Sequence, residues 1–120
     1  ETILLVEDEP KILKLTTAML GGWGYTVLAA GRPSEAIRLA EEHSGSIDLL
    51  LTDVTMPEMN GHALAKLLKS SQPELKCLFM SGYTTNIITA HGELEDGGHF
   101  LSKPFRLKDL AAKIRETLGS

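Results

Sequence analysis

Residues able to bind a cation and handle a phosphoryl group follow four separate apolar runs of this sequence. Glu7 and Asp8 follow the first, Asp53 and Ser81 follow two others, and Lys103 follows the last. Carboxylates gathered in one place repel one another, and a divalent cation such as Mg²⁺ or Mn²⁺ would offset that repulsion. A carboxylate such as Asp53 can also act as a nucleophile towards phosphorus, while an ammonium and a hydroxyl neutralise phosphoryl oxygens. The residue types therefore point to metal-assisted phosphoryl transfer.

Each of these residues taken singly has a purely structural explanation. Asp53 alone is typical of a turn or a helix cap. Glu7 and Asp8 ahead of Pro10 are typical of the acidic start of a helix. Lys103 alone indicates only that the chain turns. The hypothesis rests on the combination, because the groups follow different predicted strands.

The elements that must position these groups alternate along the whole chain. Apolar runs without period-2 alternation predict strands buried on both faces, and strands alternating with helical segments predict a parallel sheet covered by helices. The expected fold class is a doubly wound α/β domain, (βα)5, with a five-stranded parallel sheet in the flavodoxin-like order 2-1-3-4-5 and three α/β/α layers. We expect strands at Thr2–Val6, Tyr25–Ala30, Ile47–Thr52, Leu75–Met80 and His99–Leu101, and helices at Pro10–Leu20, Pro33–His43, Ala63–Leu68, Thr85–Ala90 and Leu107–Leu118.

The ends of the predicted strands supply the reason to expect one site. Ligands of open parallel sheets bind outside the carboxyl ends of the strands. Four of the five predicted strands end in polar chemistry, whereas the second ends in Ala29, Ala30 and Gly31 and is expected at an edge of the sheet. We also expect Gly21 and Gly22 to stop the first helix.

Length and composition limit the remaining classes of function. The 120 residues fit a single domain over 1–120, and 42% hydrophobic residues suffice for a core. The net charge of −4 gives no support to a nucleic-acid surface, and no apolar run approaches the ~18 residues of a membrane span. One cysteine, Cys77, lies in an apolar run and favours a reducing, cytoplasmic compartment. The chain begins at Glu1 rather than Met, which favours a piece of a longer protein.

Four stretches of the chain together resemble the receiver domains of bacterial two-component response regulators, and the resemblance covers essentially the whole sequence. They are residues 4–10 (LLVEDEP), 50–61 (LLTDVTMPEMNG), 79–83 (FMSGY) and 100–105 (FLSKPF).

The resemblance implies a role for each acidic residue of the site. Asp53 would be the phosphoacceptor. Asp8 would bind Mg²⁺ (or Mn²⁺) directly, Glu7 largely through water, and Thr55 through its backbone carbonyl. The domain would then catalyse only its own phosphorylation and dephosphorylation.

The resemblance also implies a switch around the phosphoacceptor. Lys103 would pair with the phosphoryl group, and Ser81 and Phe100 would move together on phosphorylation. Ser81 stands where the family more often has threonine; it keeps the hydroxyl and loses a methyl, so we expect altered coupling. Thr55 and Tyr83 would flank the site and tune hydrolysis of the phosphate.

The partners implied by the resemblance are a histidine kinase or a histidine phosphotransfer domain, which would donate from a phosphohistidine. The four histidines of this chain lie apart, and none has the setting of a phosphodonor. The readout face would run from Thr84 to Leu118, with homodimerisation through that face as a further expectation. Residues 78–84 are similar to receivers fused to sensor histidine kinases, which suggests a hybrid kinase whose parent chain could be anchored in a membrane.

Three alternatives stay open from the sequence. A pseudo-receiver would serve only as a protein interaction module, although such domains usually lack the acceptor aspartate or the lysine. A Mg²⁺-dependent aspartyl phosphatase would carry a second acid where this chain has Thr55. A flavodoxin-like cofactor binder would need a phosphate-cradling loop after the first strand, and Glu7 and Asp8 would repel phosphate there.

Overall fold

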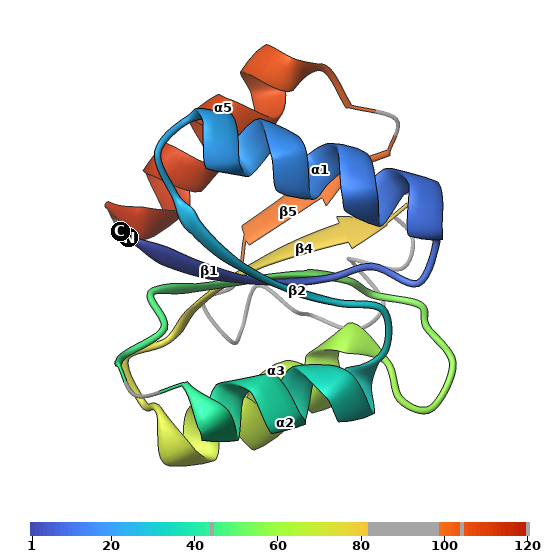
Figure 1. The fold of residues 1–120 in the computed structure, drawn as a ribbon, viewed down its shortest axis with the longest axis vertical. Helices are drawn as coiled ribbons and strands as arrows, with labels where there is room; N and C mark the ends of the chain where they lie inside the picture. The colour runs from blue at the N-terminus through green and yellow to red at the C-terminus, as the bar shows by residue number, and fades with distance from the viewer. Residues whose placement is uncertain (44, 82–98, 104, 120) are drawn as a thin grey trace.

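The computed structural model describes residues 1–43, 45–81, 99–103 and 105–119, and these residues form a parallel sheet flanked by helices (Figure 1). The predicted helix at Thr85–Ala90 and the predicted tuning residue Tyr83 lie outside the described residues. The strands are β1 (Thr2–Val6), β2 (Thr26–Ala30), β3 (Leu49–Asp53), β4 (Lys76–Ser81) and β5 (His99–Ser102), and the helices are α1 (Pro10–Gly22), α2 (Pro33–Glu42), α3 (Gly61–Ser71) and α5 (Leu107–Leu118).

The strand order confirms the predicted doubly wound topology. All neighbouring strands pair in parallel, in the order β2-β1-β3-β4-β5. Helices α1 and α5 cover one face of the sheet, and α2 and α3 cover the other (Figure 1). As predicted for the less uniformly apolar second strand, β2 lies at an edge.

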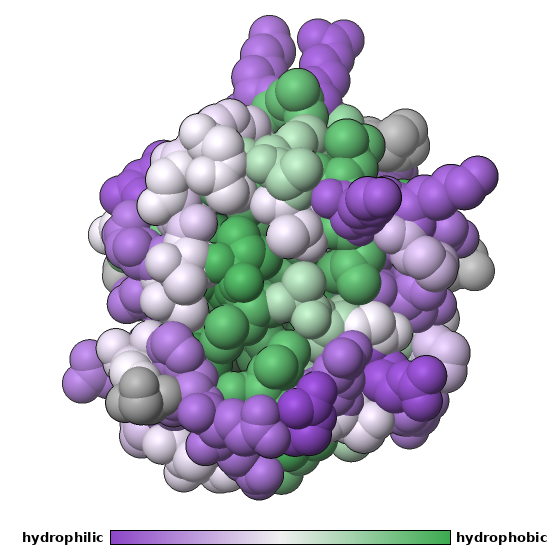
Figure 2. Space-filling model, viewed as in Figure 1, coloured by the Kyte–Doolittle hydropathy of each residue, from purple (hydrophilic) through white to green (hydrophobic). Residues whose placement is uncertain are grey.

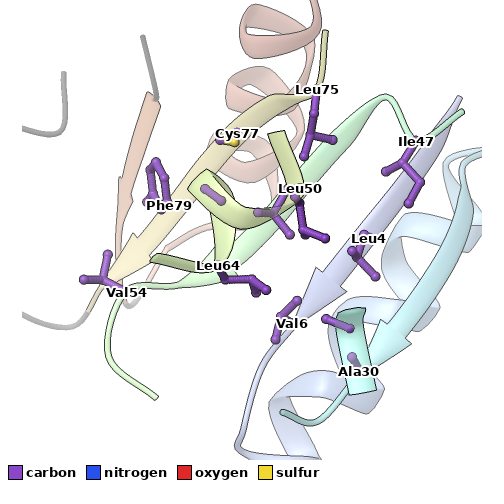
Figure 3. Close-up of a cluster of buried hydrophobic side chains, with 13 residues drawn as sticks. Leu4, Val6, Ala30, Ile47, Leu50, Val54, Leu64, Leu75, Cys77 and Phe79 are labelled. Atoms are coloured by element: carbon purple, nitrogen blue, oxygen red, sulfur yellow. The ribbon is translucent and has the colours of Figure 1, made fainter. Parts of the chain in front are cut away.

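The sheet is buried on both faces, which explains why its strands lack a clean alternation of polar and apolar residues. Leu4 and Leu50 belong to the apolar cluster beneath α2 and α3, part of which Figure 3 shows. Leu5 and Leu51, one position further along each strand, belong to the cluster beneath α1 and α5. Two packed layers therefore hold the strands in register and fix where their ends lie.

The edge strand β2 is the least buried of the first four strands. Its residues Val27, Leu28 and Ala29 are half-buried, and Figure 2 shows apolar side chains across the middle of the face where β2 forms the edge of the sheet. No helix in the described part of the chain is long and apolar enough to cross a membrane.

The prediction that Gly21 and Gly22 stop the first helix was wrong. Helix α1 runs through both glycines to Gly22, and the N–H of Trp23 still donates to the carbonyl oxygen of Met19 at 3.1 Å. The left-handed backbone position is Gly24, with φ of 96°. Glycine accepts helical as well as left-handed conformations, so the glycine pair alone did not fix the end of the helix.

Helix α3 begins at Gly61, two residues before the predicted start, and ends at Ser71 rather than Leu68. Asn60 caps it, since its side-chain oxygen accepts the N–H of Ala63 at 2.8 Å. Asp53, predicted to follow the third strand, is the last residue of β3 itself.

Gly61 closes the loop of residues 54–60 against the end of β3. Its N–H donates to the carbonyl oxygen of Val54 at 2.7 Å. A Cβ at this position would overlap the backbone carbonyl of Asp53. Only glycine allows the start of α3 to approach the end of β3 this closely.

We predict that Gly61→Ala lowers the free energy of unfolding by ~1–3 kcal/mol, because the backbone of Asp53 cannot yield without disturbing the sheet. The matched control is Gly21→Ala, where an added Cβ meets nothing within 4 Å and helix propensity should raise stability by about 0.5–1 kcal/mol. Urea denaturation of the three proteins measures both effects. Equal stability of Gly61→Ala and the unchanged chain would contradict the prediction.

Candidate functional site

Three carboxylates meet at the carboxyl edge of the sheet, as the sequence predicted. Glu7 and Asp8 directly follow β1, and Asp53 ends the neighbouring strand β3. Each offers one carboxylate oxygen, and the three oxygens lie within 4.8 Å of one another. Glu7 and Asp53 are buried and Asp8 is exposed, so the cluster opens to solvent on one side. The parallel pairing of β1 with β3 is what brings these residues together.

Lys103 bridges the two buried carboxylates. Its Nζ lies 2.6 Å from Oε1 of Glu7 and 2.6 Å from Oδ1 of Asp53. Its backbone N–H donates to the carbonyl oxygen of Ser81 at 2.8 Å, which ties the residue after β5 to the end of β4. Lys103 therefore reaches the two acids from the end of β5, which is separated from β3 by β4.

The two oxygens of Glu7 are both engaged within the protein. Oε1 accepts from Lys103, and Oε2 accepts the N–H of Glu9 at 3.0 Å. Asp8 is exposed and is the acid of the cluster that faces solvent. The assignment of Asp8 as the direct metal ligand and of Glu7 as a ligand largely through water stays a prediction.

The carboxylate of Asp53 is satisfied on one side only. Oδ1 meets Lys103, whereas Oδ2 is buried and has no hydrogen-bond donor among the described residues. A buried oxygen without a donor costs free energy that a cation or an incoming electrophile at that position would recover. Oδ2 is thus the oxygen of Asp53 that the described residues leave without a donor.

Burial and neighbouring charges shift the pKa values of Glu7 and Asp53 in opposite directions. Burial raises the pKa of Asp53 to about 7, and the adjacent Glu7 carboxylate adds to the rise while Lys103 partly offsets it. For Glu7, burial acts to raise the pKa, but its contacts with Asp53, Lys103 and the N–H of Glu9 outweigh it and lower the pKa. For Lys103, burial acts to lower the pKa, and the two carboxylates overcome it and raise the pKa. Glu7 is therefore the ionised partner of the lysine, and Asp53 is the acid that gains or loses a proton near neutral pH.

The other predicted site residues that the structure describes are Ser81, Thr55 and Phe100, and each lies in a different element. Ser81 is buried at the end of β4, on the same edge of the sheet. Thr55 is exposed in the loop two residues after Asp53. Phe100 lies within β5, paired in register with Phe79, and is half-buried against the cluster beneath α2 and α3.

One contact near the site was missed from the sequence. Glu58, in the loop after β3, accepts the N–H of Ser34 at 3.0 Å and its hydroxyl at 3.4 Å. Its backbone φ is 77°. Nothing in the sequence signals this contact, because the two residues are 24 positions apart and glutamate rarely adopts a positive φ.

Comparisons with known proteins agree with this arrangement. The chain matches the family described as the response regulator receiver domain over residues 3–115. It is similar to the sensor kinase CckA of Brucella abortus (strain 2308), with 38% identity over 98% of this chain and 12% of CckA. It is also similar to the response regulator receiver protein CpdR of the same organism, with 34% identity over 97% of this chain and 95% of CpdR. The chain thus spans a small part of CckA and nearly the whole of CpdR.

A solved structure shares the fold and carries ligands. The response regulator TrrA of Thermotoga maritima, determined in complex with Mg²⁺ and BeF, aligns with a TM-score of 0.83 and 25% identity over 98% of each chain. Sequence match, strand order and the acidic edge of the sheet agree, and this chain belongs to the response regulator receiver domain family.

Proposed function

We propose that this receiver domain accepts a phosphoryl group on Asp53 from the phosphohistidine of a histidine kinase or histidine phosphotransfer domain, in a Mg²⁺-dependent reaction. The observation that carries the proposal is the state of the Asp53 carboxylate. One of its oxygens is held by Lys103, and the other is buried beside the carboxylates of Glu7 and Asp8, with no donor in the part of the chain that the structure describes.

The residues at the edge of the sheet fit a hard divalent cation. Glu7, Asp8 and Asp53, together with the backbone carbonyl of Thr55, would supply oxygen ligands of the kind that Mg²⁺ or Mn²⁺ prefers. When bound, the cation would neutralise charge on the phosphoryl oxygens. The Mg²⁺ and BeF complex of TrrA, a relative with the same fold, supports this choice of metal.

Asp53 acts as the nucleophile in the proposed transfer. Its Oδ2 forms a bond to phosphorus, the phosphorus–nitrogen bond of the donor breaks, and the imidazole leaves with the electron pair and takes up a proton. Lys103 holds Oδ1 and so leaves Oδ2 as the oxygen that attacks in the proposed transfer. Lys103 and the Ser81 hydroxyl then meet the oxygens of the transferred group. Hydrolysis of the acyl phosphate by water, at a rate tuned by Thr55 and Tyr83, returns the carboxylate.

Phosphorylation would shift a pre-existing equilibrium between two surfaces. Ser81 would move towards the phosphoryl group and Phe100 would follow it inward, changing the face formed by residues 84–118. Phe100 suits this role because it is half-buried at the margin of a packed cluster rather than enclosed by it. The same face is our proposed site of homodimerisation.

The parent protein is proposed to be a cytoplasmic or membrane-anchored hybrid histidine kinase. Similarity to CckA, a sensor kinase, favours this assignment. Similarity to CpdR, a response regulator receiver protein, supports a stand-alone regulator as the alternative. The size of the native polypeptide decides between them, and in neither case do we expect the domain itself to bind nucleic acid.

We predict that acetyl phosphate and Mg²⁺ add one phosphoryl group to the chain, detected by intact-mass measurement soon after mixing. The Asp53→Asn protein and a sample with EDTA should show no adduct, because the first lacks the nucleophile and the second the cation.

The opposite result would change the assignment. A chain that gains no phosphoryl group, and whose amide NMR spectrum is unchanged by beryllofluoride, would be a phosphorylation-independent interaction module.

We predict that stability without metal falls as pH rises towards neutral, and that Asp53 is a main cause. The unfolded carboxyl loses its proton near its ordinary pKa of 3.8 and the folded one at about 7, so between these values the folded state binds more protons and loses stability as pH rises. In EDTA, Asp53→Asn should therefore raise the free energy of unfolding above that of the unchanged chain, and this increase should be ~2 kcal/mol larger at pH 8 than at pH 5. Urea denaturation at the two pH values measures the difference, and the same gain at both would contradict it.

A further inference from the structure

The loop of residues 54–60 leaves β3 directly after Asp53 and returns at Gly61. Its base is closed by the 2.7 Å hydrogen bond from the Gly61 N–H to the Val54 carbonyl. The loop contains Thr55, whose backbone carbonyl is one of the proposed metal ligands. A contact that restrains the far end of so short a loop would therefore limit the movement of that carbonyl.

The far end of the loop has an unfavourable backbone conformation. Glu58, with φ of 77°, is the one non-glycine residue with positive φ in the described part of the chain. The N–H of Met59 donates to the carbonyl of Pro57 at 2.9 Å, which closes a tight three-residue turn around Glu58. Glycine suits such a position and glutamate does not, so a compensating contact is expected.

That contact is made to the first turn of α2. The Glu58 carboxylate accepts the backbone N–H of Ser34 at 3.0 Å and the Ser34 hydroxyl at 3.4 Å. The residue in the N-cap position of α2 is Arg32, and its side chain makes no capping hydrogen bond. A carboxylate at a helix N-terminus satisfies free N–H groups and complements the helix dipole. Glu58 therefore caps α2 from a loop 24 residues further along the chain.

We propose that Glu58 is a positioning residue for the metal site: its clamp on α2 holds the 54–60 loop so that the Thr55 carbonyl stays in place for the cation. The inference rests on the proposed function, because it takes Thr55 as a ligand. Coupling of this kind is reciprocal, so a cation at the acidic cluster strengthens the contact between Glu58 and Ser34.

The test measures Mg²⁺ affinity by isothermal titration calorimetry on the unphosphorylated chain. Glu58→Ala should bind Mg²⁺ about threefold to fivefold more weakly, the equivalent of one lost hydrogen bond. Glu58→Gln keeps an acceptor oxygen and should stay within about twofold of the unchanged chain. The matched control is Glu41→Ala, which removes the same charge from an exposed position near the other end of α2.

The Glu58→Gly variant distinguishes a role of Glu58 in positioning the metal site from a role in stability alone. Glycine accepts the positive φ, so this variant should be more stable than Glu58→Ala, yet it should bind Mg²⁺ as weakly because the clamp is absent. The Ser34 amide resonance gives a second readout. It should shift on addition of Mg²⁺ to the unchanged chain and stay in place in Glu58→Ala.

Two results would overturn the proposal, and they are distinguishable. Unchanged Mg²⁺ affinity in Glu58→Ala, beside normal binding by the parent chain, would overturn the role of Glu58 alone. A parent chain that binds no Mg²⁺ would overturn this role and the proposed function together.

Discussion

The bridge from the Lys103 ammonium to Glu7 and Asp53 is the interaction on which the rest of the site depends. Two buried carboxylates at one edge of a sheet would be costly without a cation between them, and Nζ lies 2.6 Å from each. The bridge can form only if the ends of β1, β3 and β5 face the same way. Parallel pairing in the order β2-β1-β3-β4-β5 provides this, and apolar clusters on both faces hold the strands in register.

The gathering of Glu7, Asp8, Asp53 and Lys103 was predictable because it follows from topology. Each residue follows or ends an apolar run, and a parallel sheet places all such ends on one edge. The proton distribution was not predictable in the same way. The raised pKa of Asp53 depends first on burial, which a sequence does not state residue by residue.

Two local features show where sequence reasoning lacks the necessary information. Gly21 and Gly22 are compatible with the interior of a helix or with its end. In the structure the helix includes both, and the left-handed residue that follows it is Gly24. The contact between Glu58 and Ser34 joins residues 24 positions apart, through a backbone conformation that the glutamate side chain disfavours. The backbone preference of glutamate disfavours a positive φ, so only the folded structure reveals the contact that compensates for the cost of this conformation.

Among the described residues, Oδ2 of Asp53 is a buried side-chain oxygen without a hydrogen-bond donor, and burial without a donor costs stability. A second donor at Oδ2 would make the carboxylate more stable and, under the proposed function, would compete with a cation or a phosphoryl group for that oxygen. The free energy lost by burying Oδ2 without a partner is recovered when a cation or a phosphoryl group reaches it. A ligand that contacts this oxygen in one conformation and not in another shifts the equilibrium between the two conformations by the difference in its binding free energy. In the proposed switch, the buried carboxylate that weakens the resting domain would let a small group bound at the edge of the sheet favour one conformation over another.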